Sequence, residues 1–108
     1  MSIFDKFSLR GKVAIVTGGN RGIGKAIALG FAEAGAMVAV VARDEKKNED
    51  TLAELRGMGA SAIALTANVA ERSDLEAMLA TVTDELGPVD VLVNNAGIGL
   101  HADALTLA

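Results

Sequence analysis

Short apolar runs alternate with longer stretches of helical character along the whole chain. Strands are predicted at about residues 13–17, 37–42, 61–65 and 89–93. Residues 13–16 and 37–42 are continuously apolar, which is typical of strands buried on both faces. Helices are predicted between them, at about residues 22–34, from the charge run at 43–50 to about 57, and at 71–86. The order β-α-β-α-β-α-β predicts a parallel sheet with right-handed crossovers.

Glycine, proline and short polar residues mark where these helices begin and end. Gly35 stands where a left-handed C-cap is expected, and Gly87-Pro88 ends the third helix. Ser73 and Glu76 have the spacing of a capping box. Gly30, inside the first helix, is expected either to pack closely on the sheet or to be a tolerated glycine that costs about 1 kcal/mol against alanine.

A glycine-rich turn joins the first strand to the first helix. Gly18, Gly22 and Gly24 lead into a helix whose apolar positions are Ile23, Ala26, Ile27, Phe31 and Ala34. Glycines allow close approach of the backbone, and the unpaired amides and dipole of a helix N-terminus favour an anion. The turn predicts a dinucleotide pyrophosphate site, and the alternative is a tight turn with positive φ that binds no ligand.

The rule for doubly wound sheets gives the strand order 3-2-1-4, with a cleft above the C-terminal ends of strands one and four. The glycine turn and the segment Asn94–Gly97 both fall at these strand ends. Although they are far apart in sequence, we expect these two segments to be neighbours in space.

Two motifs together carry a family resemblance. Thr17-Gly18, followed by Gly22 and Gly24, forms the pattern Thr-Gly-x-x-x-Gly-x-Gly, and Asn94-Asn95-Ala96-Gly97 follows the last predicted strand. In this order they resemble the short-chain dehydrogenase/reductase family. The resemblance implies a Rossmann-type α/β fold, with residues 1–108 as the N-terminal, dinucleotide-binding half of a family member.

The family's catalytic residues are expected outside this chain. The resemblance implies that a Ser and a Tyr-x-x-x-Lys pair lie beyond Ala108, and the chain itself contains no Tyr. We therefore expect no catalytic residue and no hydride transfer by these residues alone. His101, the single histidine, is expected to be a surface loop residue rather than a catalytic base. Without a fifth strand beside it, strand four is expected to be an exposed apolar edge.

The residues after the second strand bear on the choice of nicotinamide cofactor. An acid at the strand end accepts hydrogen bonds from the ribose 2′-hydroxyl of NAD, whereas a basic residue accommodates the 2′-phosphate of NADP. Ala42 stands where NAD-preferring members typically carry Asp, and Arg43 follows it. Asp44 lies beyond the predicted strand, and Arg21 could reach the same phosphate. NADP(H) is therefore favoured over NAD(H), unless both arginines are ordinary exposed charges.

The resemblance also implies a set of cofactor contacts. Asn68 is expected to hydrogen-bond the adenine edge or, alternatively, its own backbone at the start of a helix. Asn94 and Asn95 resemble asparagines that stabilise the family's sheet, and Ala96 and Gly97 would line the nicotinamide side. The expected cofactor-binding residues are Gly18, Asn20, Arg21, Gly22, Ile23, Gly24, Arg43, Asn68, Val69, Asn95, Ala96 and Gly97.

Composition and charge narrow the class of partner. The net charge of −4 argues against a nucleic-acid or membrane surface, and no apolar run reaches the roughly 18 residues of a membrane span. Without Cys there is no disulfide or thiolate metal site, and no metal site is expected. A cytoplasmic location is the default expectation, because residues 1–12 lack the pattern of a signal peptide.

The sequence thus favours the cofactor-binding half of an oxidoreductase that transfers hydride between NADP(H) and a small carbonyl or alcohol substrate. The intact protein is expected to be a homo-oligomer, a dimer or a tetramer. Two alternatives remain open, namely a stand-alone nucleotide-binding module without chemistry, and a half-site partner that completes its sheet with another chain.

Overall fold

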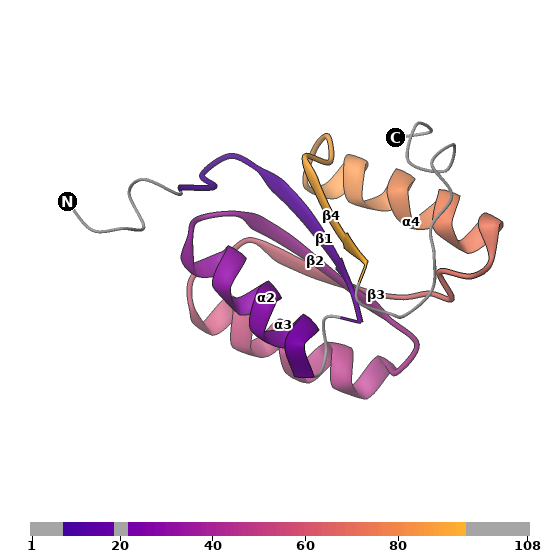
Figure 1. The fold of residues 1–108 in the computed structure, drawn as a ribbon, viewed down its shortest axis with the longest axis horizontal. Coiled ribbons are helices and arrows are strands. Elements are labelled where there is room, and N and C mark those ends of the chain that lie inside the picture. Colours follow the sequence, from indigo (N-terminus) through magenta and orange to yellow (C-terminus); the bar gives the residue numbers. More distant parts are fainter. Residues whose placement is uncertain (1–7, 19–21, 95–108) are drawn as a thin grey trace.

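Strands and helices alternate from one end of the described chain to the other. The computed structural model describes residues 8–18 and 22–94 (Figure 1). The elements follow in the order β1 (Val13–Thr17), α2 (Gly22–Glu33), β2 (Met37–Ala42), α3 (Glu45–Gly57), β3 (Ala62–Thr66), α4 (Arg72–Glu85) and β4 (Val91–Asn94). The predicted order of elements is confirmed.

The four strands form one parallel sheet in the order β3-β2-β1-β4, as predicted for a doubly wound fold. Within it, Val13 of β1 is level with Met37 of β2, and Ala14 of β1 is level with Val91 of β4. Helices α2 and α3 cover one face of the sheet, and α4 covers the other (Figure 1). Because β1 and β4 are adjacent and parallel, the segments that follow them leave from the same edge of the sheet.

Side chains of the two central strands are divided between two cores. On one face they pack against four buried residues of α4, namely Leu75, Met78, Leu79 and Val82. On the other face they pack against Ala28 of α2 and Leu55 of α3. Burial of a large aliphatic side chain contributes about 1.5–3 kcal/mol. Since both faces are covered, β1 and β2 do not alternate between apolar and polar residues, and Thr17 at the end of β1 is their only polar residue.

Asp90 joins the start of β4 to the start of β1. Its backbone N–H donates to the Val13 carbonyl at 2.9 Å, and its Oδ2 accepts from the Val13 N–H at 2.9 Å. Val13 is buried, so these bonds satisfy backbone groups that water does not reach. The strand predicted from residue 89 begins instead at Val91, because the chain first turns through Gly87, whose φ is +116°.

The structure at the N-terminus of α4 differs from the predicted capping box. Ser73 and Glu76 do not form a capping box, because Glu71 is the N-cap and Ser73 already lies inside the first turn. Glu71 makes no capping hydrogen bond with its side chain. Instead, Asp74 Oδ2 accepts from the backbone N–H of Asn68 at 2.9 Å. Asp74 therefore connects the helix to the turn that precedes it.

Helix α2 faces the sheet with small residues. Gly24 and Ala28 are its buried residues, whereas Ile23, in the predicted apolar stripe, is 73% exposed. Gly30 is exposed too, and a Cβ there would meet no neighbouring atom of the described residues within 4 Å. The expectation that Gly30 packs closely on the sheet is therefore wrong, and it is a tolerated helical glycine.

Gly30→Ala should raise the free energy of unfolding by about 1 kcal/mol, because alanine restricts the unfolded chain and meets open space in the folded one. Gly35→Ala is the matched control. As predicted for the C-cap, Gly35 has a positive φ of +101°, and a Cβ there would lie 2.8 Å from Arg10 Cγ. This variant should lose stability. Urea unfolding measures both effects, and a destabilised Gly30→Ala would contradict the open space around Gly30.

Candidate functional site

The turn from β1 into α2 forms the first part of the site. Gly18 and Gly22 have φ values of +66° and +58°, in the left-handed region that favours glycine. The Gly18 N–H donates to the Val41 carbonyl of β2 at 2.7 Å. Helix α2 begins at Gly22 and has no acidic residue in its first turn. Its unpaired amides and positive dipole end are therefore not neutralised from within the helix, which suits an anionic ligand.

Thr17 brings the two sequence motifs together. It is fully buried, and its Oγ1 lies 3.3 Å from the Val93 carbonyl oxygen and 3.1 Å from Asn94 Oδ1. Thr17 and Asn94 are also level in the register of β1 and β4. The prediction that the two motifs are neighbours at one edge of the sheet is confirmed at these residues.

The end of β2 is followed directly by a cation, and the next residue is an acid that caps a helix. The strand ends at Ala42, as predicted, and Arg43 is exposed directly after it. Asp44 is the N-cap of α3, and its Oδ1 accepts from the Lys47 N–H at 3.0 Å. The carboxylate nearest to β2 in sequence therefore caps the N-terminus of α3.

Asn48 is a neighbour of this turn that the sequence prediction missed. It is 2% exposed, and its Nδ2 donates to the carbonyls of Ala42 and Leu65 at 3.0 and 3.1 Å. A signal was present, since Asn48 is the only uncharged residue of the run 43–50. It also precedes the buried residues Thr51 and Leu55 by one and two helical turns, which places it on the same face of α3.

The turn between β3 and α4 holds two further predicted residues. Asn68 Oδ1 accepts from the Ala70 N–H at 3.1 Å, which is the alternative expected for this residue, a side chain that bonds its own backbone. Its Nδ2 makes no hydrogen bond with the residues that the structure describes. Val69 packs its side chain into the core against α4, so its backbone is the part available to a ligand.

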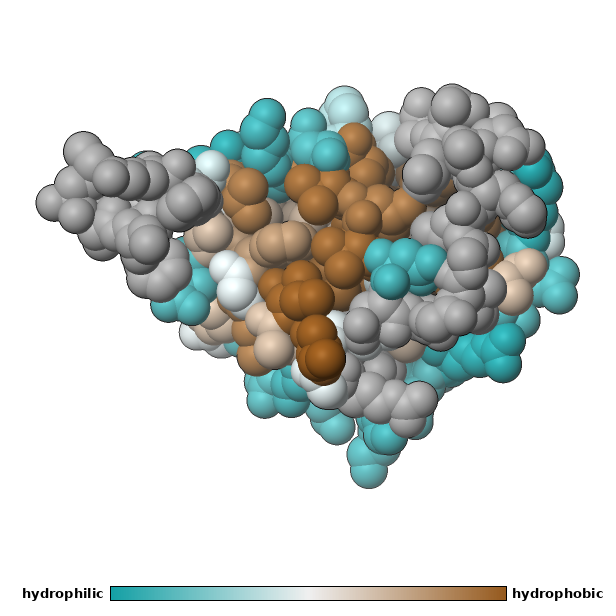
Figure 2. Space-filling model, viewed as in Figure 1, coloured by the Kyte–Doolittle hydropathy of each residue, from teal (hydrophilic) through white to brown (hydrophobic). Residues whose placement is uncertain are grey.

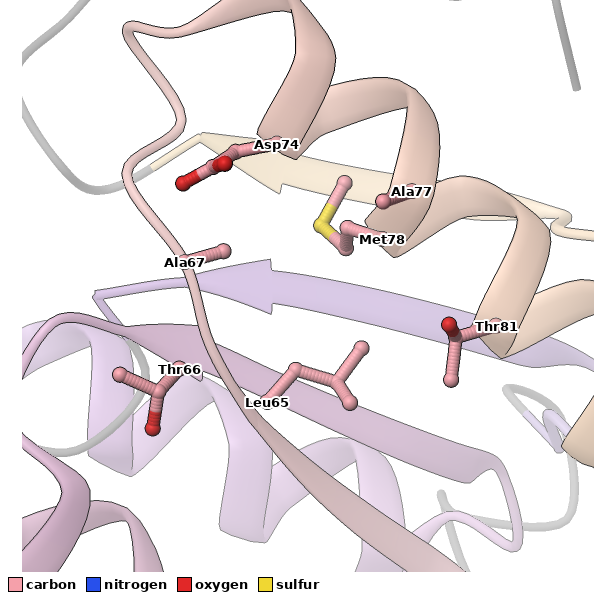
Figure 3. Close-up of a pocket in the computed structure, with 7 residues that line it drawn as sticks. All are labelled: Leu65, Thr66, Ala67, Asp74, Ala77, Met78 and Thr81. Carbon is pink, nitrogen blue, oxygen red and sulfur yellow. The ribbon is translucent and has the colours of Figure 1, made fainter.

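A pocket of about 160 Å³ lies between the end of β3 and α4 (Figure 3). Its lining residues are Leu65, Thr66, Ala67, Asp74, Ala77, Met78 and Thr81. Figure 3 shows Asp74 at one end, next to the segment that leaves β3. Among the described residues, none of the expected cofactor contacts lines this pocket.

Several expected residues lie outside the described part of the chain, namely Asn20, Arg21, Asn95, Ala96, Gly97 and His101. Ile23, at the start of α2, is described and exposed. Within residues 8–18 and 22–94, there is no group of three His, Cys, Asp or Glu residues arranged to hold a metal ion. In the same ranges, no helix is long and apolar enough to cross a bilayer.

The catalytic residues that the family resemblance implies cannot be placed in this site. They are expected beyond Ala108, and Ala108 itself lies outside the described residues. The sequence holds no Tyr at any of its 108 positions. The location of the catalytic Ser, Tyr and Lys beyond Ala108 therefore stays a prediction, and the described residues supply only candidate cofactor contacts.

Comparison with known proteins agrees with this arrangement. The short chain dehydrogenase family matches residues 12–107. The 3-oxoacyl-(acyl-carrier-protein) reductase FabG of Staphylococcus aureus is 47% identical over 88 residues, which are 81% of this chain and 36% of FabG. The short-chain dehydrogenase/reductase homolog YusS of Bacillus subtilis is 42% identical over 91 residues, which are 83% of this chain and 84% of YusS.

A solved structure shows the same fold. The crystal structure of actinorhodin polyketide ketoreductase with NADPH matches with a TM-score of 0.77 at 39% identity, over 98% of this chain and 41% of the ketoreductase chain. The chain spans 29% and 36% of the length of the first curated relatives that it matches. Since the family match covers nearly all of the chain, and the strand order and both motifs agree with it, the chain belongs to the short-chain dehydrogenase family.

Proposed function

We propose that this chain is the cofactor-binding part of an oxidoreductase that transfers hydride between NADP(H) and a small carbonyl or alcohol substrate. The observation that carries the proposal is that the end of β1, which leads through Gly18 toward the start of α2, lies beside the end of β4 at one edge of the sheet. The relative FabG is named as a reductase, and the ketoreductase structure contains NADPH, which supports this chemistry.

The described residues fit such a cofactor by charge and by hydrogen-bonding type. The amides at the start of α2 suit the pyrophosphate, and the exposed Arg43 suits a phosphate on the ribose. The Nδ2 group of Asn68 is a donor and suits an acceptor nitrogen on the adenine edge. Bound NADP(H) supplies or accepts the hydride, and the residues of this chain bind and orient it.

The preference for NADP(H) rests on the turn after β2. Position 42, at the end of β2, is an alanine and offers no carboxylate to the 2′-hydroxyl of NAD. The nearest acid in sequence, Asp44, caps α3. The exposed side chain between them is the guanidinium of Arg43. A guanidinium forms charge-assisted hydrogen bonds with phosphate but lacks acceptors for a ribose hydroxyl.

The double substitution Ala42→Asp with Arg43→Ala should reverse the cofactor preference. The affinity for NADPH should fall about tenfold or more, since a charge-assisted hydrogen bond contributes about 1.5–3 kcal/mol, and the affinity for NADH should rise. Titration calorimetry with both cofactors measures the ratio. Lys46→Ala, which removes an exposed cation in the same charge run, is the matched control and should leave the ratio unchanged. An unchanged preference for NADPH in the double variant would contradict the assignment.

The unpaired side of β4 supports the proposal that this chain is one part of a larger fold. Among the described residues, β4 has β1 on one side and no strand on the other. Val91, Leu92 and Val93 are half-buried, although they lie at the edge of the sheet. Figure 2 shows that an apolar surface extends over β4 and α2 in this view. An unpaired apolar edge of this kind is suited to receive a further strand, and we propose that the remaining strands of a doubly wound sheet add there.

The 108-residue chain should bind NADPH without oxidising it in the presence of carbonyl substrates. The reason is that it has a cofactor site but no Tyr to donate a proton to the substrate oxygen. Calorimetry measures binding, and the loss of absorbance at 340 nm measures turnover. NADPH-dependent reduction by this chain alone would contradict the proposed division between a binding part and a catalytic part.

A further inference from the structure

Asn48 is buried at the N-terminal end of α3, within a run of charged residues. Every other residue from Arg43 to Asp50 is charged, whereas Asn48 is 2% exposed. Its Nδ2 donates both of its hydrogens, to the Ala42 carbonyl of β2 at 3.0 Å and to the Leu65 carbonyl of β3 at 3.1 Å. Burying an amide without partners costs free energy, so these bonds fix its side chain against the ends of the two strands.

The same residue contacts both neighbours of Arg43. Besides the bond to the Ala42 carbonyl, the backbone N–H of Asn48 donates to the Asp44 carbonyl at 3.0 Å. The carbonyl of Ala42 also accepts from the Ala67 N–H at 3.2 Å, which holds it in the sheet. The backbone of the turn is thus fixed immediately before and immediately after Arg43, while the Arg43 side chain is exposed.

We infer that Asn48 is a positioning residue that fixes Arg43 for recognition of a phosphate on the ribose of the cofactor. This inference rests on the proposed preference for NADP(H). A long, exposed guanidinium binds a phosphate with a smaller loss of entropy when its backbone is already held in place. The bond to Leu65 adds the end of β3 to the same unit, so the turn is held by two strands and one helix.

Two adenosine nucleotides isolate the contribution of the 2′-phosphate to binding, because adenosine 2′,5′-bisphosphate and adenosine 5′-monophosphate differ only in that group. Calorimetry gives the ratio of their dissociation constants for the wild-type chain and for Asn48→Leu and Asn48→Asp, which both remove the two donors. We expect the preference for the bisphosphate to fall about tenfold in both variants, in line with the loss of one well-placed charge-assisted hydrogen bond. Affinity for the monophosphate should change little.

Two further variants separate positioning from a general loss of structure. Thr51→Val alters a residue that is 1% exposed on the same face of α3, one turn further on, and should leave the ratio unchanged. Arg43→Ala should lower the ratio, and its value shows how large the effect is when the guanidinium is removed. If Arg43→Ala lowers the ratio and neither Asn48 variant does, the positioning role is overturned. If the wild-type chain shows no preference for the bisphosphate, the NADP(H) assignment fails, and the positioning role fails with it.

A measurement on the wild-type chain covers the case in which the Asn48 variants do not fold. The side-chain amide resonances of Asn48 are followed by NMR during titration with each nucleotide. A larger shift with the bisphosphate than with the monophosphate is expected, because the side-chain amide of Asn48 donates to the carbonyl of Ala42, the residue before Arg43. Equal shifts with both nucleotides would overturn the positioning role.

Discussion

The parallel pairing of β1 with β4 is the interaction on which the site depends. At the start of the two strands, Asp90 bonds both the N–H and the carbonyl of Val13. At their end, the buried Thr17 lies within hydrogen-bond distance of Asn94. Because the strands are parallel and in register between these contacts, the glycine turn after β1 and the segment after β4 leave from the same edge. The pairing thus brings together the ends of β1 and β4, which are far apart in sequence, and the proposed cofactor site lies at this edge.

Polar side chains fix each turn at this edge in a different way. Asp44 caps α3, Asn48 bonds the ends of β2 and β3, and Asp74 holds the Asn68 N–H at the start of α4. These polar side chains are not members of the two apolar cores. Their effect is to reduce the freedom of the turns before a ligand arrives, which lowers the entropy lost on binding. Arg43, which we propose recognises the cofactor, is exposed between these fixed positions.

The sequence predicted the sheet, the helices and the strand order, because continuous apolar strands and the alternation of elements depend on local pattern and on general rules of chain topology. It placed Thr17 and Asn94 together for the same reason. What it missed depends on tertiary contacts. Gly30 was expected to pack closely and is exposed, since Gly24 and Ala28 are the residues of α2 that face the sheet. The buried position of Asn48 is set by the ends of β2 and β3, which are distant in sequence.

The central claim is that the edge formed by β1, β2 and β4 binds NADP(H), and NMR titration of the isotope-labelled chain with NADPH tests it most directly. The backbone amides of Gly18, Gly22 and Gly24 should shift most strongly, together with those of Arg43 and Asn68. The residues around the pocket between β3 and α4, such as Ala77 and Thr81, should shift little. Saturating NADPH without shifts in the glycine turn, or with the main shifts around that pocket, would contradict the account.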